Sequence, residues 1–255
     1  MQITFLGTGT SCGVPVIGCQ CEVCQSTDER DRRLRCSILV ETERTRLLVD
    51  AGPDFRQQML RMPFRRIDGI LITHSHYDHV GGMDDIRPFC QFGEINVYAD
   101  PIARKGMLQM LPYCFAENRY PGVPAIGLHE IHAGEPLRIG DIDVMPIRVM
   151  HGQLPILGYR FGRFAYITDM KTMDSDQLPL LEGVEVLVVN ALRFDKPHFS
   201  HQLVDDAVAF ARRVGARRTL LTHMCHDIGL HEQVNQKLPE GVELAYDGQE
   251  LIVFS

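Results

Sequence analysis

The chain reads GILITHSHYDHV over residues 69–80, where an apolar run passes directly into a cluster of imidazoles and one carboxylate. The run Gly69–Thr73 predicts a buried strand. Alternate side chains of an extended segment point the same way, so His74 and His76 can converge on one metal ion. Asp78 and His79 follow in the expected turn and can face a second ion. Because imidazole and carboxylate together suit zinc, manganese or iron, this stretch predicts a metal site at the end of a strand.

Short strands and helices alternate on both sides of this stretch. Runs rich in β-branched residues between turn signals predict further strands at Gln2–Leu6, Ser37–Glu41, Arg46–Val49, Ile95–Ala99, Ile142–Val149, Leu157–Phe161, Phe164–Thr168, Val186–Val189, Thr219–Thr222 and Leu251–Phe254. Helices are predicted over Pro53–Arg61, Ile102–Leu111, His201–Val214 and His231–Lys237. This order predicts an α/β protein in which helices cover sheets. No repeat or linker interrupts it, so we expect a single domain over residues 1–255.

Composition and charge narrow the class of protein. The 255 residues are 45% apolar and 23% charged, the balance of a globular protein that can bury a sizeable core. The net charge of −7 argues against nucleic acid as the main partner, although a local basic patch can coexist with an acidic total. The chain shows neither a signal peptide nor an apolar run of membrane-spanning length. We therefore expect a cytoplasmic protein that does not insert into a membrane.

Three of the eight cysteines lie close together in one loop, as Cys19, Cys21 and Cys24. In a reducing compartment such thiols are poor disulfide candidates. Thiolates at this density predict a tetrahedral structural zinc that needs a fourth ligand. A redox pair of Cys21 and Cys24, or free thiols in a loop, are the alternatives. The four isolated cysteines with no assigned function are Cys12, Cys36, Cys90 and Cys114.

Residues 74–79 resemble the His-x-His-x-Asp-His signature of the metallo-β-lactamase superfamily. The stretch LLVDAG at residues 47–52 also resembles the strand that precedes this signature in the family. The resemblance implies an αββα sandwich. It also implies that the Asp50 carboxylate orients a metal ligand through hydrogen bonds. The alternative for Asp50 is a turn-forming aspartate before glycine.

The same resemblance implies the rest of a dinuclear metal site. It assigns His151 as the third histidine of the first metal, Asp169 as a carboxylate bridging both metals, and His223 as the last ligand of the second. Each ends a predicted strand, so all can gather at one edge of the sandwich. The implied ions are two divalent metals, zinc or manganese. The complete predicted ligand set is His74, His76, Asp78, His79, His151, Asp169 and His223.

A narrower resemblance extends over almost the whole chain. The stretches Leu6–Thr10 and Gly13–Pro15, the thiol loop and the metal ligands are similar to the phosphoribosyl cyclic phosphate phosphodiesterases of phosphonate breakdown. In that group a histidine three residues after the last catalytic ligand completes the thiol site. That position is His226 in this chain, and Cys225 is the rival fourth ligand.

The resemblance implies a metal-dependent phosphodiesterase whose substrate is a small, cyclic sugar phosphate or a nucleotide-like diester. A hydroxide held by the two metals would attack phosphorus, and His201 would protonate the leaving oxygen. His198 is a competitor for that role. Asp78 is predicted to take part in catalysis as well as in metal binding. Arg193 is the candidate for binding substrate phosphate, with a surface arginine as the alternative.

Other functions remain open at this stage. The same metals can activate water against a carboxylic ester, lactone or lactam. Residues 8–10 also resemble the tRNA 3′-processing endonucleases (ribonuclease Z), although no extended basic arm is visible in the sequence. A metal-binding protein without catalysis is a further alternative, against which the complete ligand set argues. Residues 87–124 match no family segment, and we expect them to form a lid, a homodimer surface or local core.

Overall fold

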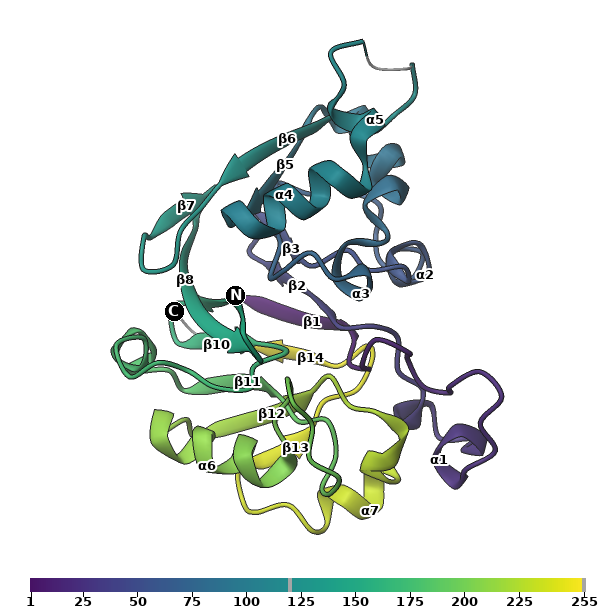
Figure 1. Cartoon of the computed structure of the whole chain (residues 1–255), viewed down its shortest axis with the longest axis vertical. Helices are drawn as coiled ribbons and strands as arrows, with labels where there is room; N and C mark the ends of the chain where they lie inside the picture. The colour runs from purple at the N-terminus through teal and green to yellow at the C-terminus, as the bar shows by residue number, and fades with distance from the viewer. Residues whose placement is uncertain (119–120, 254–255) are drawn as a thin grey trace.

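The computed structural model describes residues 1–118 and 121–253, and in this part of the chain two seven-stranded sheets pack face to face. In Figure 1, the strands of the first sheet between residues 46 and 130 lie in the upper half of the molecule, and those of the second sheet between residues 164 and 244 lie in the lower half. The first sheet has the order β14 (Glu250–Ile252), β1 (Gln2–Gly7), β2 (Ser37–Glu41), β3 (Arg46–Val49), β4 (Gly69–Leu71), β5 (Ile95–Ala99) and β6 (Ile126–Glu130). The second has the order β13 (Val242–Leu244), β12 (Arg218–Thr222), β11 (Val186–Asn190), β10 (Phe164–Ile167), β9 (Leu154–Phe161), β8 (Ile142–His151) and β7 (Leu137–Ile139).

Both sheets are mixed in direction, and this decides where the loops gather. Strands β3 to β6 are parallel to one another, as are β10 to β13. The remaining pairs within each sheet are antiparallel. Because parallel strands end at the same edge, the segments that follow β3, β4, β10 and β12 can meet at one rim of the sandwich.

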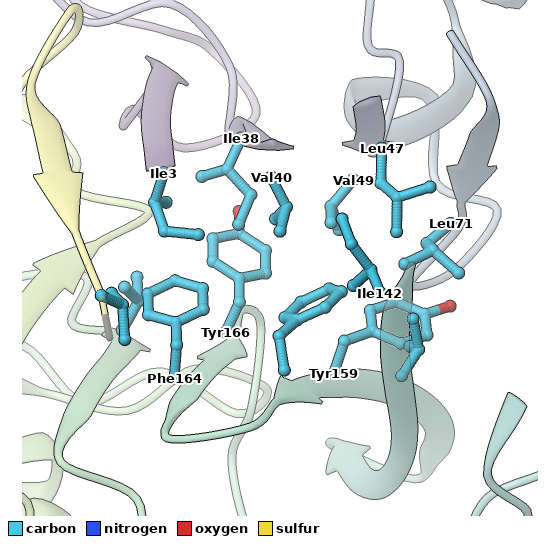
Figure 2. Close-up of a cluster of buried hydrophobic side chains, with 14 of the residues drawn as sticks. Ile3, Ile38, Val40, Leu47, Val49, Leu71, Ile142, Tyr159, Phe164 and Tyr166 are labelled. Carbon is cyan, nitrogen blue, oxygen red and sulfur yellow. The ribbon is translucent and has the colours of Figure 1, made fainter. Parts of the chain in front are cut away.

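The alternation of side chains along the strands builds a three-part core. In β2, Ile38 and Val40 face the other sheet, whereas Leu39 faces the outer helices. In β10, Tyr166 likewise lies between the sheets and Ala165 lies on the outer face. Figure 2 shows the central cluster, in which aliphatic side chains of the first sheet pack on aromatic rings of the second. Strands buried on both faces explain why these segments read as continuous apolar runs.

Helices cover both outer faces. The first sheet is covered by α2 (Phe55–Met59), η2 (Met83–Phe92), α4 (Pro101–Met110) and α5 (Pro112–Phe115). The second is covered by η3 (Leu178–Leu181), α6 (Val204–Val214) and α7 (His231–Asn235). Shorter helical turns lie in the loops, as α1 (Glu22–Gln25), η1 (Glu29–Asp31), α3 (Tyr77–Val80) and η4 (His226–Ile228). The αββα sandwich expected from the sequence is confirmed.

Most predicted elements are present, with ends shifted by up to three residues. The helix predicted from His201 was wrong at its start, because α6 begins at Val204. Leu203 is extended, and its backbone N–H donates to the Asp206 carboxylate, which begins the helix there. The turn expected around Asp78 is instead the helix α3. Strands β6, β7 and β13 were not predicted, and Phe254 of the last predicted strand lies outside the described residues.

The described part of residues 87–124 includes β5 of the first sheet and helices that cover the outer face of this sheet. Phe89, Met107 and Cys114 of this segment belong to the outer core. The homodimer surface and the single domain over residues 1–255 stay predictions. No helix within the described ranges has both the length and the apolar character to cross a membrane.

Candidate active site

Three histidines form the first group of candidate metal ligands. His74 follows β4, His76 directly precedes α3, and His151 ends β8, so both sheets contribute. The ligand atoms of the three side chains lie within 4.8 Å of one another. Nε2 of His74 is 3.0 Å from Nδ1 of His76, close to the separation of about 3.3 Å between two nitrogens on one tetrahedral metal. Nδ1 of His151 lies 2.7 Å from the Asp169 carbonyl, which leaves its Nε2 for the site.

Two carboxylates and two histidines form the second group. Asp78 and His79 lie in α3, while Asp169 follows β10 and His223 follows β12. Their ligand atoms also lie within 4.8 Å of one another, and all four residues are buried. Nε2 of His79 is 3.3 Å from Oδ2 of Asp169. Nε2 of His223 is 3.1 Å from Oδ1 of the same carboxylate. Asp169 therefore lies between two imidazoles of this group.

The buried nitrogens of this group fit divalent metal ions. Nε2 of His79 and Nε2 of His223 are buried and have no hydrogen-bond partner. A buried polar atom without a partner is costly unless an ion or a water molecule satisfies it. Burial opposes ionisation of Asp169, but His223 and His79 hold the pKa of its carboxyl well below the usual range. The residues therefore supply an anionic, imidazole-rich donor set that suits zinc or manganese.

Asp50 holds His79 in place from behind. Its Oδ2 lies 2.7 Å from Nδ1 of His79 and also accepts a hydrogen bond of 2.8 Å from the Thr73 hydroxyl. Its Oδ1 accepts the Thr73 backbone N–H at 2.8 Å. With Nδ1 engaged by a carboxylate, His79 presents Nε2 to the site. These are the contacts that the predicted role of Asp50 requires.

Backbone strain is concentrated at this site. Four residues other than glycine have positive φ in the described ranges, and three of them are Asp50 (62°), Asp169 (57°) and His223 (56°). Such conformations cost about 1–3 kcal/mol each and persist where the surrounding structure imposes them. Each of the three follows the carboxyl end of a parallel strand, so the strain accompanies the turn that brings its side chain into the site.

His201 lies beside the second group, in the loop between β11 and α6. It is buried, and its Nδ1 lies 3.8 Å from Oδ1 of Asp169 without a hydrogen-bond partner. Burial, with the neighbouring His223, lowers the pKa of His201 to about 3 in the protein alone. His198 is half-exposed, and its Nδ1 lies 3.2 Å from the Ser200 hydroxyl. Proximity to Asp169 therefore favours His201 over His198 as the candidate acid.

Arg193 is occupied by its own loop. Its Nε donates to the carbonyl oxygens of Asp195 at 3.0 Å and Lys196 at 2.9 Å. Its Nη1 lies 3.7 Å from Oδ2 of Asp227. The guanidinium thus stabilises the loop that carries His198 and His201, and its role in substrate binding stays a prediction.

Three residues that the sequence did not single out hold the site together. Thr73 binds Asp50, as described, and the Ser200 carbonyl lies 3.1 Å from Nδ1 of His151. Lys171 donates from Nζ to the His201 carbonyl at 3.1 Å. Thr73 directly precedes the histidine cluster and Lys171 follows Asp169 by two residues. Their positions next to predicted site residues were therefore a signal in the sequence, but this signal did not indicate the role of each residue.

The thiol loop forms a separate candidate metal site. The donor atoms of Cys19, Cys21, Cys24 and His226 lie within 4.8 Å of one another. Nδ1 of His226 is 3.3 Å from the Cys19 sulfur and 3.2 Å from the Cys21 sulfur. The contact with His226 lowers the pKa of the Cys21 thiol to about 6, whereas burial raises that of Cys24 to about 11.

This set suits a tetrahedral zinc. Of the two candidates for the fourth donor, the structure places His226 beside the three thiols. His226 completes the group, whereas Cys225 is buried and donates its backbone N–H to the Leu192 carbonyl. His226 comes three residues after His223, so the end of β12 leads to both candidate metal sites.

Comparison with known proteins places the chain in a family. The sequence pattern of the beta-lactamase superfamily domain matches residues 45–224. A crystal structure of a new diphosphatase from the PhnP family has a TM-score of 0.91 and 38% identity, covering 98% of this chain and 96% of that one. Zinc-bound PqqB from Methylobacterium extorquens has a TM-score of 0.79 and 20% identity, covering 99% and 100% of the two chains, and this likeness shows the fold alone.

A curated relative matches over nearly the full sequence. The octanoyltransferase of Porphyromonas gingivalis is 41% identical over 254 residues, which is 99% of this chain and 52% of that protein. The chain therefore spans about half the length of this relative. Together with the sandwich and the two groups of candidate ligands, these similarities show the family. The chain belongs to the metallo-β-lactamase superfamily and, within it, is similar to the PhnP family.

Proposed function

We propose that the protein is a metal-dependent phosphodiesterase that hydrolyses a small sugar phosphate or nucleotide-like substrate. The observation that carries the proposal is the position of Asp169. Its carboxylate faces His79 and His223 on one side, and its Oδ1 lies 3.8 Å from Nδ1 of His201. Metal ligands and a candidate proton donor therefore meet at one carboxylate. The likeness to a diphosphatase of the PhnP family supports phosphoryl chemistry.

Each ligand group would hold one divalent metal, zinc or manganese. His74, His76 and His151 would bind the first, and Asp78, His79 and His223 the second, with Asp169 between them. Two metals bound there would make water a nucleophile near neutral pH and neutralise charge on the phosphate. Asp50 would fix the ring of His79 throughout. Cys19, Cys21, Cys24 and His226 would hold one structural zinc.

His201 would give a proton to the leaving oxygen. With Nδ1 directed at Asp169, the proton would leave from Nε2. The low pKa of this histidine in the protein alone comes mainly from burial. A phosphodiester anion bound beside the ring would favour the charged form, and so raise that pKa toward the range a general acid needs.

The decisive test is a panel of substrates with the protein as isolated, after chelation, and after addition of zinc or manganese. Bis(4-nitrophenyl) phosphate would be compared with 4-nitrophenyl phosphate, an aryl ester and a β-lactam. We expect metal-dependent turnover of the diester above the others. Preference for the ester or the lactam would overturn the substrate class, and cleavage of a precursor tRNA in its place would favour the endonuclease alternative. The homodimer and the cytoplasmic location stay predictions.

A further inference from the structure

Phe199 is the most exposed aromatic side chain in the described part of the chain, at 83%. Large aromatic side chains usually bury most of their surface, so a ring held almost entirely in solvent calls for a reason. Phe194, in the same loop, is only 38% exposed. Phe199 directly precedes Ser200, whose carbonyl lies 3.1 Å from Nδ1 of His151. The exposed ring therefore belongs to a backbone segment that contacts His151, one of the first group of candidate metal ligands.

A row of rings leads from the metal ligands to Phe199. The rings of His151 and His201 have centroids 4.8 Å apart, as do those of His201 and His198. The ring of His198 then stacks on Phe199, with centroids 4.8 Å apart and an angle of 29° between the planes. One face of Phe199 is thus supported by His198, and its high exposure leaves the other face open.

Gly152 lies close to the ring of Phe199. It follows His151 and has a φ of +61°, which favours glycine. A Cβ built on Gly152 would lie 3.7 Å from Cδ2 of Phe199. The aromatic ring therefore lies next to the backbone that carries His151, a candidate metal ligand.

Tyr77 is the other strongly exposed aromatic residue near the ligands, at 64%, but it differs in one respect. Its ring lies against the backbone of its own helix, because a Cβ at Gly81 would lie 2.7 Å from Cε2 of Tyr77. The ring of Tyr77 is thus used in packing on Gly81. Phe199 is the better candidate for contact with a ligand.

We infer that Phe199 forms a stacking subsite for a nucleobase, so that the substrate is a nucleotide carrying the scissile phosphate. The inference rests on the proposed phosphodiesterase function and narrows its substrate class. An exposed ring supported on one face by another ring matches the platform on which bases stack, and every base offers a planar face. A cyclic sugar phosphate without a base has no group that would use this ring.

Two phosphodiesters with the same leaving group test the subsite. Thymidine 5′-(4-nitrophenyl phosphate) carries a base, and methyl 4-nitrophenyl phosphate does not. We expect the metal-loaded wild-type protein to prefer the thymidine substrate in kcat/KM. Phe199→Ala should lower that preference by about tenfold, mainly through KM, and Phe199→Trp should keep it. Phe194→Ala is the matched control in the same loop and should leave the preference unchanged.

The outcomes separate the two proposals. Equal losses on both substrates in Phe199→Ala, or an unchanged preference, would overturn the stacking subsite while the phosphodiesterase function stands. Failure of the wild-type protein to hydrolyse either compound would instead count against the phosphodiesterase function. In that case calorimetry with the metal-loaded protein still decides the subsite. We expect AMP to bind more tightly than ribose 5-phosphate in the wild type and not in Phe199→Ala, and equal affinities in the wild type would refute the inference.

Discussion

The two candidate metal sites are built in opposite ways. The dinuclear group takes its candidate ligands from or near the ends of strands in both sheets, and most of them are buried, although His76 is exposed. The thiol group takes three donors from one loop of residues 19–24, and all four of its residues are only half-buried. A site fixed by the core exists before a metal arrives, whereas a site on a loop depends on the metal for its order. The comparison predicts that the metals serve chemistry at the first site and folding at the second.

Removal of the shared carboxylate should have the largest effect. Asp169→Asn keeps the shape of the side chain but removes the charge between His79 and His223. We expect kcat/KM on bis(4-nitrophenyl) phosphate to fall by about a thousandfold or more, together with loss of bound metal. Metal content and melting temperature would be measured beside activity. Asp176→Asn, at an exposed carboxylate, is the control, and full activity with two metals in Asp169→Asn would break the assignment.

Asp50→Asn should have the next largest effect, since it weakens the support behind His79 without removing a ligand. We expect a loss of about 10–100-fold in metal affinity or activity. Asp247→Asn is a matched control, because the half-buried Asp247 also accepts hydrogen bonds, from Thr8 and Leu34, but outside the site. If both variants lost metal affinity equally, the effect of Asp50 would reflect general destabilisation only.

The thiol site should respond in stability rather than in chemistry. Chelation of the whole protein, or Cys21→Ala, should expose the backbone around residues 12–32 to hydrogen exchange while the strands of both sheets stay protected. Cys21→Ala should also lower the melting temperature by several degrees, as expected for a loss of about 1–2 kcal/mol. Cys12→Ala removes an exposed thiol outside the group and serves as control. Unchanged metal content and melting in Cys21→Ala would refute the structural zinc.

Of the four substitutions, Lys171→Met should have the smallest effect. It tests whether the position of His201 matters for catalysis. The change removes the hydrogen bond to the His201 carbonyl and leaves every ligand in place. We expect a loss of about tenfold or less in kcat. A positioning role predicts a larger loss with a poor leaving group than with 4-nitrophenolate, since protonation matters more there. Lys196→Met, in the loop that carries His201, is the control. Equal losses on both leaving groups in Lys171→Met would contradict the positioning role.

The structure brings together the residues that the sequence proposed as ligands, because most of them end or follow a short apolar strand and the strands dictate where they meet. The architecture could be predicted from the same segments, since strands buried on both faces appear in the sequence as continuous apolar runs. Strands of three residues such as β7 and β13 were missed, because so short a segment shows no period. The start of α6 depended on one side chain, Asp206. The surroundings of Phe199 depended on contacts between loops, which no local pattern encodes.

The close spacing of His223 and His226 has a consequence for how such a chain can evolve. Both lie beyond the end of β12, one directed to each candidate metal site. The residues between them, Met224 and Cys225, are tied by backbone hydrogen bonds to Thr8 and Leu192. Insertion or deletion of a residue here would shift one histidine relative to the other. Because the other ligands of each candidate site are held by separate segments, one of the two histidines would then leave its site. The segment can therefore tolerate substitutions between the two histidines, but the length of that spacing is constrained.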